Sequence, residues 1–97
     1  MTELLLDASS WKTKDDVYDS FFRVIGAPSW HGRNLDALHD SIGSGQVNSV
    51  EVSYRLIVRN SQDIGAEAKS ILEDFVKLIH ELVTEGCPVE IRVENTN

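Results

Sequence analysis

The chain has 97 residues, a formal net charge of −7, 41% hydrophobic residues and one cysteine. That length predicts a single domain over residues 1–97 with a modest core. The acidic balance argues against nucleic acid or an anionic membrane as the partner, and favours a cationic partner or simple solubility. We expect a cytoplasmic protein, because the sequence has one cysteine, no signal-like leader and no apolar run long enough to span a membrane.

The first predicted elements are a strand and a helix. The strand covers residues 3–7, and its leucines Leu4, Leu5 and Leu6 indicate burial on both faces. Thr13, followed three residues later by Asp16, resembles a capping box with Asp in place of the usual Glu. The helix that follows is predicted by apolar spacing and is stopped by a glycine and a proline. Its apolar positions are Val17, Tyr18, Phe21, Phe22, Val24 and Ile25.

Residues 30–40 predict a loop that becomes a second helix. Asn34 is a favoured N-cap, because its side-chain oxygen can accept a hydrogen bond from a free amide of the first turn. Apolar residues recur at helical spacing on one side of this helix and predict the side that meets the core. They are Leu35, Leu38 and Ile42. Asp36, His39 and Asp40 share the other side, next to the aromatic loop.

The group of Asp36, His39 and Asp40 allows three interpretations. In the plainest interpretation, Asp36 interacts favourably with the positive N-terminal end of the helix dipole and Asp40 is simply solvated. An acid–base pair or a metal site is a weak interpretation, because His39 and Asp40 are adjacent and diverge by about 100° around a helix. No HExxH or clustered Cys/His pattern accompanies them. A protein-binding surface explains best why carboxylates lie beside aromatic residues, so we predict no catalytic residue, no metal and no cofactor.

The second half of the chain predicts strand, helix and strand. Residues 50–59 alternate apolar and polar side chains, and Ile57 on the polar side indicates cover on both faces there. The long helix that follows ends at Gly86 and Pro88. Its apolar stripe is Ala68, Ile71, Leu72, Phe75, Ile79, Leu82 and Val83. A last strand alternates over residues 89–94, and the whole order predicts an α/β fold with a small parallel sheet.

Residues 30–40 resemble the signature of the barstar family, an aromatic pair followed by Gly-x-Asn-Leu-Asp-Ala-Leu-aromatic-Asp. Residues 85–87, ahead of the last strand, resemble the C-terminal end of that family. The resemblance covers most of the chain and implies a barstar-like fold, a three-stranded parallel sheet flanked by helices. Two departures concern length. Residues 50–52 form an added extended piece, and the connection over residues 60–65 is shorter than in the family, where a small helix usually lies.

The same resemblance implies an intracellular inhibitor, or immunity protein, that blocks the cationic active site of a barnase-type ribonuclease. Such a site holds phosphates, and carboxylates on an acidic helix would take their place opposite arginine forks. By resemblance Asp40 lies deepest in that site, Asp36 lies beside it and Glu81 reaches the rim. The full set of partner-binding residues implied in this way is Trp30, His31, Gly32, Asn34, Leu35, Asp36, His39, Asp40, Gly43 and Glu81.

Three departures within the motif favour an enzyme target other than barnase itself. His31 stands where tyrosine is usual, His39 where tryptophan is common, and Gly43 where a hydroxyl residue is common. The alternative function is a non-inhibitory interaction or regulatory module with the same fold, binding another basic protein. A small acid–base enzyme is a remoter third. Under the inhibitor hypothesis the partner is a basic ribonuclease or related toxin, and one monomer of this chain binds one copy of it.

Overall fold

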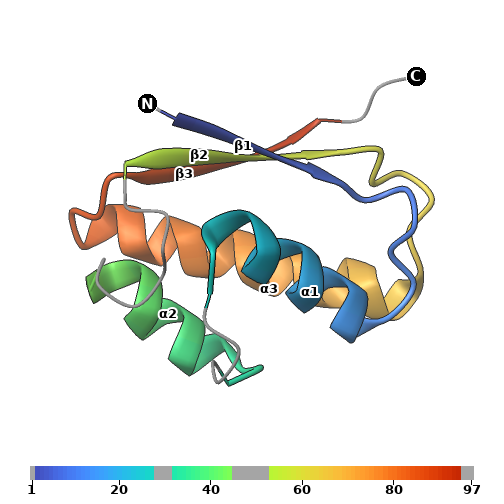
Figure 1. Ribbon diagram of the computed structural model, residues 1–97, viewed down its shortest axis with the longest axis horizontal. Coiled ribbons are helices and arrows are strands. Elements are labelled where there is room, and N and C mark those ends of the chain that lie inside the picture. Colours follow the sequence, from blue (N-terminus) through green and yellow to red (C-terminus); the bar gives the residue numbers. More distant parts are fainter. Residues whose placement is uncertain (1, 28–31, 45–52, 95–97) are drawn as a thin grey trace.

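The computed structural model describes residues 2–27, 32–44 and 53–94. Over these residues the chain folds into two layers, a sheet and a set of helices (Figure 1). The elements in chain order are β1 (Thr2–Asp7), α1 (Lys14–Ile25), α2 (Leu35–Ser44), β2 (Tyr54–Arg59), α3 (Ala66–Thr84) and β3 (Val89–Glu94). Residues 50–52, which we expected to be extended and to lead into the second strand, lie outside the described residues.

The sheet is parallel throughout, and its strand order is β1-β2-β3. On the central strand, Leu56 pairs with Leu4 on one side and with Ile91 on the other. Parallel neighbours need a crossover, which α1 and α2 supply between β1 and β2, and α3 supplies between β2 and β3. The prediction of an α/β fold with a three-stranded parallel sheet is confirmed.

The helices α1, α2 and α3 lie on one side of the sheet, and no described element covers the other side (Figure 1). The prediction that the first strand is buried on both faces is therefore wrong. Leu6 points toward the helices and is 3% exposed, whereas Leu5 points the other way and is 55% exposed. Ile57, the neighbour of Leu5 on the central strand, is buried although no helix covers it, because a strand lies on each side of it.

The side of the sheet away from the helices carries rows of opposite charge. Arg55 on the central strand donates from Nη1 to Glu3 at 2.9 Å and from Nε to Glu90 at 2.6 Å. At the other end of the strands, Arg59 Nε donates to Glu94 at 3.2 Å. These carboxylates raise the pKa of Arg55, mainly through the hydrogen bond to Glu90. We call this side the outer sheet face; its residues are Glu3, Leu5, Asp7, Arg55, Ile57, Arg59, Glu90, Arg92 and Glu94.

The core between the two layers is built on aromatic side chains. Phe21 of α1 and Phe75 of α3 stack face to face with ring centroids 4.2 Å apart. Tyr18 meets Phe75 edge-on at 5.2 Å. Trp11, in the connection between β1 and α1, is also buried, and its indole N–H donates to Ser20 Oγ at 2.8 Å. These contacts fix α3 beneath the sheet, and α3 is the helix against which α2 packs.

The predicted capping box is present at the start of α1. Thr13 Oγ1 accepts a hydrogen bond from the Asp16 amide at 3.3 Å, and the Asp16 carboxylate accepts one from the Thr13 amide at 3.0 Å. The Lys12 amide also donates to that carboxylate, at 2.8 Å. These backbone donors lower the pKa of Asp16. At the far end of α3, Gly86 has a φ of 88°, which confirms it as the left-handed residue that ends the helix.

Candidate protein-binding site

The orientation of α2 decides which of its side chains reach solvent. Asn34 caps the helix, with its Oδ1 accepting from the Ala37 amide at 2.7 Å. Leu38 and Ile42 are buried and Leu35 is half-buried against the core, because they lie on the side of α2 that faces α3. The opposite side of the helix is therefore turned outward. It carries the two aspartates of the motif and the imidazole between them.

Four side chains from two helices line one shallow hollow of about 370 Å³. Asp36, His39 and Asp40 come from α2, and Glu81 comes from α3. The Asp40 side chain is 90% exposed, whereas that of His39 is 31% exposed. We call this group of four the acidic face. Glu81 is 41 positions beyond Asp40 in the numbering, so its place beside the α2 carboxylates follows only from the packing of α2 on α3.

Glu85, which is not among the predicted site residues, also reaches this surface. It is the residue that ends α3, and its carboxylate lies 3.1 Å from His39 Nε2. Asp40 lies on the other side of the imidazole, 3.9 Å from Nδ1. His39 is thus held between two carboxylates and joins the C-terminal end of α3 to the middle of α2. The signal that could have found Glu85 is its position next to Gly86, which predicts a turn there but not the helix it turns toward.

No lysine or arginine of the described chain lines the hollow of the acidic face. Among the described residues, no lysine or arginine forms an ion pair with Asp36, Asp40 or Glu81. Arg33, the nearest arginine in sequence, pairs instead with Asp19 of α1, and this carboxylate raises its pKa. Its guanidinium also lies 5.8 Å from the centre of the Phe22 ring. Within the described part of the chain, Asp36, Asp40 and Glu81 are therefore not held in ion pairs with lysine or arginine.

The remaining predicted site residues lie around this centre. Asn34 and Leu35 line a second groove of about 580 Å³ together with Asp36. Its other charged residues are Glu67 and Asp74 of α3 and the cations Lys14 and Arg33, so this groove has mixed charge. Trp30 and His31 lie outside the described residues.

The two predicted glycines have packing reasons for their size. A Cβ on Gly32 would lie 3.0 Å from Asn34 Nδ2, the amide group of the residue that caps α2. A Cβ on Gly43 would lie 3.3 Å from Leu82 Cδ2. Gly43 is therefore at the contact between α2 and α3, and the lack of a side chain there lets the two acidic helices approach each other closely.

The described residues give little support to a metal site, a reactive cysteine or a membrane-spanning helix. No group of three or more His, Cys, Asp or Glu side chains there is arranged to hold a metal ion. Cys87 is partly buried, its Sγ lies 3.9 Å from the Ile42 carbonyl oxygen, and burial raises the pKa of its thiol. A raised pKa disfavours the thiolate, the form in which a cysteine attacks. Over the same residues, no helix is both long and apolar enough to cross a bilayer.

The fold and this surface together define a small α/β protein with a three-stranded parallel sheet and an unneutralised acidic face formed by two helices. The model of the Barstar family, described as Barstar (barnase inhibitor), matches residues 1–94. The chain belongs to the Barstar family. Among curated proteins, no sequence matches it significantly. The family's description is that of an inhibitor rather than an enzyme, and its partner is another protein.

Proposed function

We propose that this protein is an intracellular inhibitor that binds and blocks the cationic active site of a barnase-type ribonuclease or related toxin. The observation that carries the proposal is the convergence of Asp36, Asp40 and Glu81 on one hollow that no described lysine or arginine lines. Membership of the Barstar family supports it. Because such an inhibitor protects the cell that makes the enzyme, the proposal assigns the protein to the cytoplasm.

The chemistry of the target explains the residue types. A ribonuclease must hold phosphate groups, so its active site presents arginine and lysine side chains. Carboxylates at the spacing of one helical turn, such as Asp36 and Asp40, offer oxygen atoms that arginine forks can bind in place of phosphate oxygens. Asp40, whose side chain is more exposed than that of Glu85, would reach deepest into the site of the enzyme. Glu81 would contact the rim from α3.

The net charge adds a kinetic advantage. A chain with a charge of −7 is attracted to a basic enzyme before contact, and the attraction is concentrated at the surface where the negative charges are unpaired. Barnase and barstar are themselves a well-known example of such electrostatic steering, and its magnitude in that pair does not transfer to this chain. The qualitative expectation is a rate of association that falls as salt is added.

His39 distinguishes this surface from a purely anionic one. Its imidazole is held between Glu85 and Asp40, so that its ring edge, rather than a large indole, lies at the centre of the acidic face. A smaller group there leaves room for a bulkier side chain of the partner. This supports a target different from barnase, while the carboxylates on either side still call for a cationic one.

The test is inhibition of purified basic ribonucleases of the barnase type by the purified chain. The proposal expects stoichiometric inhibition by one copy per enzyme for at least one such enzyme, and its loss in Asp40→Lys. Asp63→Lys is the matched control, because it makes the same charge change at an exposed turn residue that lies outside the acidic face. Equal loss in both variants would show a nonspecific charge effect and overturn the proposal. Binding without inhibition would favour the interaction module instead.

A further inference from the structure

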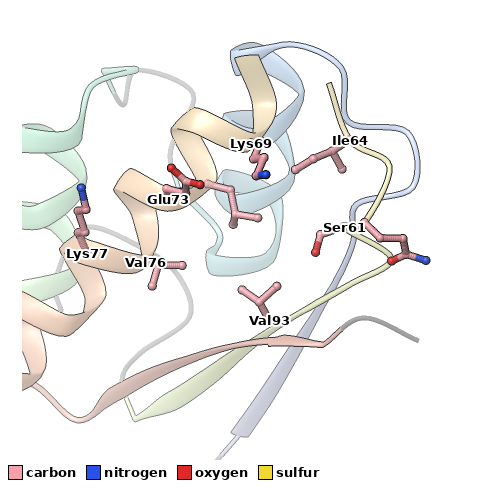
Figure 2. A pocket seen from close by; sticks show the side chains of 9 residues that line it. Ser61, Ile64, Lys69, Glu73, Val76, Lys77 and Val93 are labelled. Carbon is pink, nitrogen blue, oxygen red and sulfur yellow. The ribbon is translucent and has the colours of Figure 1, made fainter. Parts of the chain in front are cut away.

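A second surface lies on the side of α3 that faces away from α2. Here α3, the connection after β2 and strand β3 enclose a hollow of about 610 Å³ (Figure 2). Its apolar part is supplied by Ile64 of the connection, Leu72 and Val76 of α3 and Val93 of β3. Figure 2 shows Val76 and Val93 pointing into it. Glu81 is five residues beyond Val76, or about 140° around the helix, so the hollow and the acidic face lie on different sides of α3.

Apolar side chains are exposed along this side. The described residues leave three large apolar side chains exposed, and two of them are Val83 at 48% and Val93 at 41%. Val83 is two helical turns after Val76 and therefore lies on the same side of α3. Strand β3 is also an edge strand of the sheet that the described residues form. Its outer backbone groups are a template for another strand, and exposed valines flank it.

We propose that a second copy of this chain pairs here, through antiparallel β3 strands centred on Ile91, to make one six-stranded sheet. In this register, Glu90 lies opposite Arg92 of the second copy, and Arg92 lies opposite its Glu90. Val89 lies opposite Val93 of the second copy, so Val93 is covered. Opposite charges and apolar pairs placed directly across two strands are the contacts that stabilise such a ladder.

Charge and the length of the ladder together select this register among the possible two-fold arrangements. Centring the pair on Arg92 would place Arg92 against itself and Glu90 against Glu94. Centring it on Glu90 would oppose two glutamates and bring Pro88, which has no N–H, into the ladder. Centring it on Val93 would also place Arg92 opposite Glu94, but only residues 92–94 of each strand would then pair, because β3 ends at Glu94. The Ile91 register combines opposite charges with a longer ladder, in which residues 89–93 of each copy pair.

The same register continues the charge pattern of the outer sheet face. In one copy, the row Glu3–Arg55–Glu90 alternates in sign. The next residue across the new pair is Arg92 of the second copy, which extends the alternation by one more charge. The other edge strand offers no such pairing with itself, because the outward residues of β1 are Glu3, Leu5 and Asp7 and include no cation. This asymmetry favours a closed dimer through β3.

Antiparallel pairing also brings the two α3 helices together with opposite directions. A two-fold axis through the sheet keeps both helical layers on one side, so the C-terminal half of one α3 faces the N-terminal half of the other. Val83 of each copy then lies toward the hollow lined by Leu72 and Val76 of the other copy. Both acidic faces stay open, and each can still take one partner. In this arrangement the protein is a dimer that binds two partners, and not the monomer that we expected from the sequence.

The test is sedimentation of the full chain over a range of concentrations. We expect a reversible monomer–dimer equilibrium for the parent chain. Arg92→Glu places glutamates opposite each other, and Glu90→Arg places arginines opposite each other, so each should raise the dissociation constant by at least about tenfold. A mixture of the two variants should recover the dimer, because each then faces the opposite charge. Arg23→Glu is the control: it makes the same change of charge as Arg92→Glu at an exposed residue of α1, and it should dimerise like the parent.

Hydrogen exchange supplies a second measurement that needs no variant. On raising the concentration of the parent chain, amides within residues 89–93 should gain protection, while those of β1 should not. A parent chain that stays monomeric at high concentration, an Arg92→Glu variant that dimerises as tightly as the parent, or a mixture that fails to recover the dimer would each overturn the proposal. Growth into larger assemblies would do the same, since it would indicate head-to-tail pairing of β1 with β3. Inhibition of a ribonuclease does not enter these measurements.

Discussion

The outer sheet face and the acidic face carry the same kind of side chain in different electrostatic settings. On the outer sheet face, Glu3 and Glu90 share Arg55, and Glu94 lies against Arg59 and Arg92. On the acidic face, the described chain supplies no arginine or lysine to Asp36, Asp40 or Glu81. The first arrangement neutralises its charge within the protein. The second leaves a surface that a cationic partner can complete, which is why we assign binding to it.

The largest effect is expected from a substitution in the core that anchors α3, because both the sheet and α2 pack on this helix. Phe75→Ala empties the stack with Phe21 and should cost about 3–5 kcal/mol of unfolding free energy, because α3 loses its anchor in the core. Chemical denaturation measures the loss. Phe75→Leu keeps most of the volume and should recover much of the stability. If Phe75→Ala unfolds like the parent, the position of α3 does not depend on this stack.

The next effect concerns binding alone. Asp40→Ala should weaken the complex with the cognate enzyme by about 2–5 kcal/mol, since a partner arginine would be buried without its carboxylate. Its fold should survive, because the side chain is 90% exposed and alanine is a better helix former than aspartate. Calorimetric titration and thermal unfolding measure the two quantities separately. Asp63→Ala is the control. Early unfolding of Asp40→Ala would mean that Asp40 is structural and would contradict its assigned role.

A smaller effect is expected on the outer sheet face. Arg55→Gln leaves Glu3 and Glu90 without their shared cation and should lower Tm by about 2–5 °C, as expected for solvent-accessible ion pairs. It should leave binding at the acidic face unchanged, and this contrast with Asp40→Ala sharpens the comparison. Differential scanning calorimetry and the same titration provide both readouts. A marked loss of partner binding in Arg55→Gln would show that the two faces are not independent.

The smallest effect is expected at Asp16, whose carboxylate accepts hydrogen bonds from backbone amides. Donors from Lys12 and Thr13 lower the pKa of Asp16 from its ordinary value of 3.8. A carboxyl whose pKa is lowered in the folded state stabilises the protein above its unfolded pKa, and this stability is lost as the pH falls through the folded value. Asp16→Asn should therefore flatten the acid limb of the stability curve below about pH 4.

The control for that experiment is the other half of the capping box. Thr13→Val removes a cap hydrogen bond without removing a titrating group, so it should lower the whole curve and keep most of its slope. Denaturation at several pH values between about 2 and 7 gives both curves. An unchanged acid limb in Asp16→Asn would show that the amide donors do not hold this carboxylate more tightly when the chain is folded.

Much of the fold could be predicted because its signals are local. The Thr13–Asp16 box, the Asn34 cap and the turn at Gly86 each depend on residues within one or two helical turns. The order of strands and helices then limits the sheet to parallel pairing. For the same reason, the outward side of α2 follows from the spacing of Leu38 and Ile42.

The features that escaped prediction depend on contacts between distant segments. Three consecutive leucines look alike whether a strand is covered on one face or on two, and the exposure of Leu5 follows only from all helices lying on one side. Burial of Trp11 depends on Ser20 and Phe21 meeting a loop that has no periodicity. The pairing of His39 with Glu85 spans 46 positions. Local sequence patterns do not predict a contact between residues so far apart in the chain.

The central place of β2 has a consequence for the protein while it is being synthesised. Among the described strands β1 pairs only with β2, and the bonded residues Glu3 and Arg55 are 52 positions apart. At about 5–20 residues per second, a ribosome needs about 3–10 s to make that length of chain. For all of that time the three leucines near the start of the chain have no strand to pair with. The nascent protein therefore exposes these three leucines earliest and longest, and this interval is when aggregation or chaperone binding would compete with folding.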